Sequence, residues 1–101
     1  MKPELNRASA QQWLKDEIAL IYQRLAAGKD VSPAQRLYVE GQVKLLLAFG
    51  IIEYPWIKQL VADLYQQYLH SSVSDTFWLW AESEQRFYLP VKMHKAPVYK
   101  H

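Results

Sequence analysis

The side chains best suited to do chemistry in this sequence are three histidines and two pairs of acidic residues. His70, His94 and His101 lie far apart along the chain, and the short paired spacings typical of zinc ligands are missing. His70 falls at the end of a predicted helix, where the helix dipole favours a cation. His94 and His101 fall in a basic stretch that we expect to be solvated. The histidines therefore predict no metal site.

The acidic pairs have simple structural explanations. Asp16 and Glu17 lie in the second turn of a predicted helix, near its positive dipole end. Glu82 and Glu84 lie in the turn of a predicted hairpin, where charged side chains are solvated. The sequence has no nucleophile elbow, and its three glycines form no phosphate-binding loop. We expect a protein that is not an enzyme, with no catalytic residue, metal or cofactor.

Composition places the chain among ordinary globular proteins. It has 101 residues, of which 50% are hydrophobic and 22% charged, and this length is typical of one domain. We expect a single domain over residues 1–101, with flexible ends at 1–8 and 94–101. The sequence contains no cysteine, which excludes disulfides and thiolate chemistry.

The sequence also predicts a cytoplasmic location. The first residues carry no apolar segment of the kind found in secretory signals. The longest apolar stretch, 43–52, is far shorter than the roughly 20 residues that span a bilayer. We therefore expect no membrane association.

Apolar spacing and capping residues predict three helices, over 10–27, 33–49 and 55–70. The second has the strongest start signal, because Ser32 can cap it while Pro33 takes the first helical position, where a missing amide costs nothing. In the first helix, one stripe is predicted to face the core: Leu14, Ile18, Ile21, Tyr22 and Leu25.

The second helix has more apolar residues than one face can bury. Its main stripe, taken as the primary packing face, contains Leu37, Tyr38, Gly41, Leu45, Ala48 and Phe49. Its polar edge consists of Arg36, Glu40 and Lys44. A second stripe is left over: Val39, Val43, Leu46 and Leu47. Trp13 and Leu20 lie outside the core stripe of the first helix in the same way. Large exposed apolar patches are uncommon on monomers. The second helix is therefore either the central helix of the domain or the seam of a dimer, and Trp13 and Leu20 either pack under a loop or the C-terminal segment or contact a partner. We take the partner contact as the expectation.

The C-terminal part is predicted to form a β-hairpin. Residues 76–81 and 86–93 are rich in aromatic and branched side chains on either side of the polar stretch 82–85. Trp78 and Trp80 would share one face of this hairpin and join the partner-binding set. The expected fold class is mainly α (α+β), with a three-helix core followed by a C-terminal aromatic β-hairpin.

These features favour a small non-enzymatic protein–protein interaction domain, adaptor or regulatory in kind, that self-associates through its apolar helix faces. The expected partner is a second copy in a homodimer, or another protein.

The alternative is a winged-helix-like, DNA-associated transcriptional regulator, with the hairpin as its wing. Its candidate nucleic-acid contacts are Lys58, Arg86, Lys92, Lys95 and Lys100. A net charge of +2 and an acidic wing tip weigh against this alternative, because electrostatic attraction supplies most of the non-specific affinity for DNA.

Overall fold

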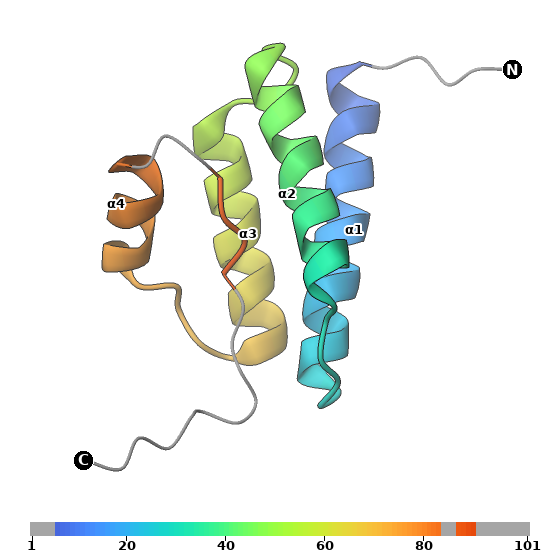
Figure 1. Cartoon of the computed structure of the whole chain (residues 1–101), viewed down its shortest axis with the longest axis vertical. Coiled ribbons are helices and arrows are strands. Elements are labelled where there is room, and N and C mark those ends of the chain that lie inside the picture. Colours follow the sequence, from blue (N-terminus) through green and yellow to red (C-terminus); the bar gives the residue numbers. More distant parts are fainter. Residues whose placement is uncertain (1–5, 84–86, 91–101) are drawn as a thin grey trace, which may run out of the picture.

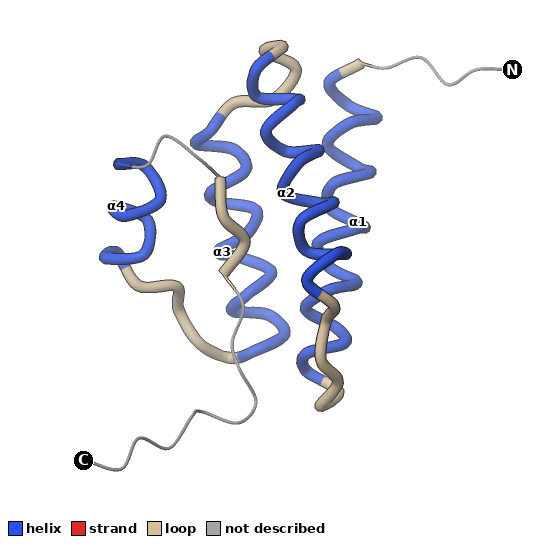
Figure 2. Tube along the Cα trace, in the orientation of Figure 1, coloured by secondary structure: helices blue, strands red, loops and turns tan. Residues whose placement is uncertain are grey.

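Four α-helices make up most of the described chain in the computed structural model (Figure 1). The structure describes residues 6–83 and 87–90. The helices are α1 (Arg7–Ala26), α2 (Pro33–Ala48), α3 (Tyr54–Leu69) and α4 (Asp75–Ser83). Figure 2 shows the segment 87–90 as a loop, and the described residues contain no strand. The mainly helical class predicted from the sequence is confirmed.

Capping chemistry explains where α1 begins and where α1 and α2 end. The Asn6 side chain accepts a hydrogen bond from the Ser9 N–H at 2.9 Å, and Ser9 Oγ accepts one from the Asn6 N–H at 3.2 Å. Residues 6–8, predicted to be part of a flexible end, thus form the cap and first turn of α1. Gly28 and Gly50 follow α1 and α2 with φ values of 84° and 71°, a left-handed conformation that ends a helix.

The predicted second and third helices agree with α2 and α3 to within one residue at each end. Ser32 caps α2 as expected, because its Oγ accepts a hydrogen bond from the Gln35 N–H at 3.1 Å. Within the described residues, no helix has the length and apolar character needed to cross a membrane.

The predicted β-hairpin is wrong in its first half, because residues 76–81 lie within α4. Ser74 starts this helix with its Oγ, which accepts a hydrogen bond from the Phe77 N–H at 3.1 Å. Trp78 and Ala81, one helical turn apart, are both buried. Burial of this helical stripe outweighs the strand preference of the aromatic residues.

Only part of the second predicted strand falls within the described residues. Phe87 to Pro90 form an irregular segment that returns to the helices, and we call it the return segment. The rest of that strand, residues 1–5 of the flexible end predicted at 1–8, and the flexible end predicted at 94–101 lie outside the described residues.

The core draws on every helix and on the return segment. Helix α1 packs against both α2 and α3. Its buried side chains are Ala10 and all five residues of the stripe predicted from the sequence: Leu14, Ile18, Ile21, Tyr22 and Leu25. The other elements contribute Val39, Val43, Leu46, Ile57, Val61, Leu64, Trp78, Phe87 and Leu89.

Candidate functional site

The surplus apolar surface of α2 lies on the opposite side from the one predicted. Val39, Val43 and Leu46 are at most 6% exposed and belong to the core, and Leu47 is half-buried against it. These four residues pack within their own chain, so their assignment to a partner surface is corrected.

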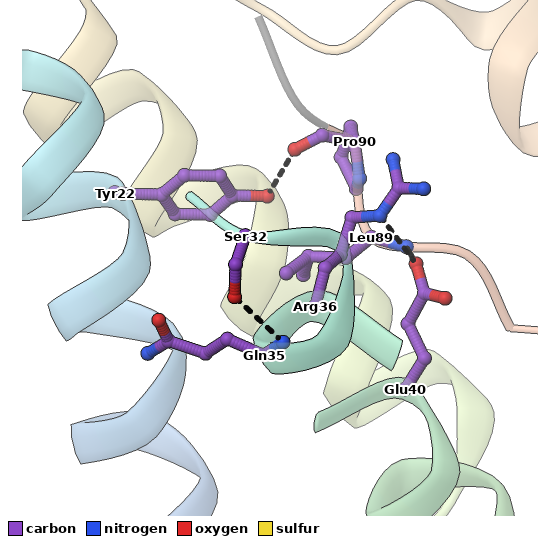
Figure 3. Close-up of polar contacts among 7 residues, drawn as sticks. All are labelled: Tyr22, Ser32, Gln35, Arg36, Glu40, Leu89 and Pro90. Carbon is purple, nitrogen blue, oxygen red and sulfur yellow. Dashed lines mark hydrogen bonds and ion pairs between the residues drawn. The ribbon is translucent and has the colours of Figure 1, made fainter. Parts of the chain in front are cut away.

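The return segment explains why α2 buries the stripe that the sequence predicted to be exposed. Glu40, next to Val39 on α2, is only 4% exposed, and its Oε2 accepts a hydrogen bond from the Leu89 N–H at 2.7 Å (Figure 3). Leu89 and Phe87 are buried in the same core cluster as Val39. The chain thus brings two further apolar side chains to the inner side of α2.

Two side chains hold the return segment by its backbone. Glu40 accepts from the Leu89 N–H, and the Tyr22 hydroxyl donates to the carbonyl oxygen of Pro90 at 2.8 Å (Figure 3). Both hydrogen bonds are buried, so without them these backbone groups would lose water and gain no partner. We call Tyr22 and Glu40 the C-terminal clamp.

Burial in this clamp raises the pKa of Tyr22 well above the ordinary value of 10.0, because a buried phenolate loses its hydration, and Tyr65 and Glu40 raise it further. Burial also raises the pKa of Tyr54 and Tyr65. A raised pKa means that the folded state holds the proton more tightly than the unfolded state. The stabilisation that these tyrosines contribute to the folded state is therefore complete below pH 10 and is lost as the pH rises beyond it.

We expect the free energy of unfolding to fall above about pH 10, by up to about 1.4 kcal/mol per pH unit from Tyr22. Urea unfolding at a series of alkaline pH values measures this slope. Tyr22→Phe removes the titrating hydroxyl and should make the slope shallower, leaving the contributions of Tyr54 and Tyr65. An identical slope in the variant would contradict the assignment to Tyr22.

Helices α1 and α2 lie side by side, away from α4 (Figure 1). An exposed apolar face covers the outer side of α2 and the adjoining side of α1. Its large side chains are between 37% and 71% exposed: Trp13, Leu20, Leu37, Tyr38, Leu45 and Phe49. The Trp13 and Tyr38 rings meet edge to face with their centroids 6.4 Å apart, which joins the two helices into one surface. We call this surface the α1/α2 face.

Sequence reasoning found only Trp13 and Leu20 of this face. The sequence assigns the four members on α2 to the primary packing stripe of that helix. The signal that pointed outward is Gly41, which lies in the middle of that stripe and leaves the backbone open to solvent.

The two tryptophans of the predicted hairpin, both assigned to a partner surface, differ in their surroundings. Trp78 is buried against the core, so its assignment to a partner surface is corrected. Trp80 is half-exposed and stacks on Tyr88, with ring centroids 4.6 Å apart and planes 24° apart. Trp80 lies on α4, and the α1/α2 face does not include it.

Known proteins give no guide to the role of these surfaces. No family model, no curated protein and no solved structure matches the chain. The function has to be argued from the geometry of the described residues.

The geometry of the described residues gives little support to a catalytic or metal-binding role. In residues 6–83 and 87–90, no group of three or more histidine, cysteine, aspartate or glutamate side chains comes together to hold a metal ion. Asp16 of the first acidic pair accepts a hydrogen bond from Gln12 Nε2 at 2.9 Å. A shallow depression of about 460 Å³ between α1 and α3 contains one cation and one carboxylate, Lys15 and Asp63.

The predicted nucleic-acid contacts are only partly visible. Lys58 Nζ lies 3.5 Å from Glu82 Oε1 and 5.7 Å from the centroid of the Trp78 ring, so its charge is already engaged within the chain. Arg86, Lys92, Lys95 and Lys100 lie outside the described residues. The first strand of the predicted wing is part of α4. The described residues therefore lack the wing that motivated the DNA-binding alternative.

Proposed function

We propose that this protein is a non-enzymatic interaction domain that self-associates through the α1/α2 face. The observation that carries this proposal is the exposure of six large apolar side chains on one side of two packed helices. Their exposed fractions run from 37% to 71%. With a full area of roughly 150–250 Å² for a large apolar side chain, the six together present on the order of 600 Å² to solvent. A standard protein interface takes about 800 Å² from each partner.

The composition of the face supports the same function. Trp13, Tyr38 and Phe49 are aromatic, and aromatic side chains are the commonest anchors of protein interfaces. The outward side of α3 is different in character, since Gln59 and Gln66 are exposed there. Outside the α1/α2 face, the exposed large apolar side chains of the described residues are Leu79 and Trp80, both on α4.

The solution mass tests the proposal. Light scattering over about a hundredfold range of concentration should give twice the monomer mass of 11.9 kDa at the upper end. Leu45→Glu should reduce the mass to that of a monomer, because the new carboxylate stays hydrated in the free chain but would lose water in the dimer. Its circular dichroism should match that of the wild type.

Gln66→Glu is the matched control, since it adds the same charge to the exposed polar side of α3. This variant should keep the wild-type mass. A wild-type protein that is monomeric at every concentration would overturn the proposal, as would a dimer that Leu45→Glu and Gln66→Glu weaken equally.

A further inference from the structure

On the exposed stripe of α2, two of the four residue pairs at equal distances from Gly41 are identical. Ala34 and Ala48 lie seven positions either side of this glycine, and Leu37 and Leu45 lie four positions either side. With about 100° per residue, these side chains lie within about 60° of Gly41 around the helix axis. The whole stripe is exposed: Pro33, Ala34, Leu37, Tyr38, Gly41, Lys44, Leu45, Ala48 and Phe49.

Such an arrangement fits a two-fold contact. In an isologous interface, residue i of one copy meets residue j of the other, and j meets i in turn. Two antiparallel helices centred on one residue therefore pair positions at equal distances on opposite sides of it. With the axis beside Gly41, Leu37 would meet Leu45 of the second copy, and Ala34 would meet Ala48. Both contacts join like with like, and each occurs twice.

The remaining pairs favour an antiparallel over a parallel arrangement. Tyr38 would meet Lys44 of the second copy, where an ammonium group near an aromatic ring is attracted to the ring face. Phe49 would meet Pro33 at each end. In a parallel pair, Lys44 would face its own copy, and the two like charges would repel each other.

Gly41 itself supports a close approach. A Cβ added at Gly41 would meet nothing within 4 Å, and its φ is not in the positive range found at Gly28 and Gly50. Packing within the chain therefore gives no reason for a glycine here, although glycine costs about 1 kcal/mol relative to alanine inside a helix. A second backbone that comes close at this point supplies one.

We infer that the occupant of the α1/α2 face is a second copy of this chain, bound with the two α2 helices antiparallel and the two-fold axis beside Gly41. This inference rests on the proposed function and adds the orientation of the partner. Trp13, in contact with Tyr38, would flank the central helix pair on each side.

Disulfide trapping tests the orientation, because the chain has no cysteine of its own. We would prepare Ala34→Cys and Ala48→Cys separately, tag one of them, mix them and oxidise the mixture. The antiparallel pair predicts a disulfide that joins one variant to the other, at least about fivefold more abundant than either self-linked product. A disulfide needs Cα atoms roughly 4.4–6.8 Å apart. The two copies of position 34 would lie roughly 20 Å apart along the helices.

Two further variants complete the test. Gly41→Cys lies at the axis and should link to itself, whereas Gln66→Cys on the polar side of α3 should not link. If Ala34→Cys and Ala48→Cys each link only to themselves, the helices are parallel and the inference is overturned. If light scattering shows a dimer but the three α2 variants do not link, the inference fails and the proposed self-association stands. A monomeric wild type would overturn both.

Discussion

Val43→Glu is expected to unfold the protein, whereas Leu45→Glu, two residues further along the same helix, should leave it folded. The Val43 side chain is fully buried in the core cluster. A carboxylate there would lose its hydration without gaining a partner, at a cost of several kcal/mol. Small domains have a total stability of about 5–15 kcal/mol, so this loss leaves little or none. Leu45 is half-exposed, and a glutamate there remains in water.

Circular dichroism and thermal unfolding of both variants, at concentrations where the wild type is monomeric, measure this contrast. The orientation of α2 predicted from the sequence alone, with Leu45 inside and Val43 outside, gives the opposite result. A folded Val43→Glu together with an unfolded Leu45→Glu would therefore show that the faces of α2 are assigned the wrong way round.

Glu40→Leu is expected to destabilise the fold by about 2–3 kcal/mol, because it leaves the buried Leu89 N–H without its acceptor. The substitution also removes the ion-pair partner of Arg36, whose Nε lies 4.0 Å from Glu40 Oε2 and makes no hydrogen bond within the described residues. Urea unfolding measures the loss.

Glu40→Gln is the matched control. Its amide oxygen can still accept the hydrogen bond from Leu89, so the cost should stay below about 1 kcal/mol. Amide hydrogen exchange at Leu89 should accelerate strongly in the leucine variant and only slightly in the glutamine variant. Equal destabilisation and equal exchange in the two variants would contradict the role of Glu40 as a clamp on the backbone.

The clamp also explains why the sequence predicted the wrong face of α2. Both stripes of this helix carry branched apolar residues at helical spacing, so periodicity alone cannot choose between them. The sequence assigns Glu40 to the polar edge of the helix, because a carboxylate is rarely buried without a partner. Glu40 has such a partner, but it lies 49 positions later in the chain. No local pattern contains that information.

The core stripe of the first helix could be predicted from local periodicity alone. All five residues of its core stripe are buried, because α1 packs against both α2 and α3 and its polar residues lie together on the other side. The error in α4 has a different origin. Its aromatic residues favour a strand, and the signals for a helix, Ser74 followed by Asp75 in the first turn, occupy only two positions.

The clamp has a consequence for the order in which the chain can fold. Tyr22 reaches Pro90 across 68 positions, and Glu40 reaches Leu89 across 49. The helices form from neighbouring residues, but these contacts require the closure of long loops, whose entropy cost makes them late and slow. During synthesis the N-terminal helices leave the ribosome well before the return segment does. The inner side of α2 therefore stays open until the return segment has also left the ribosome.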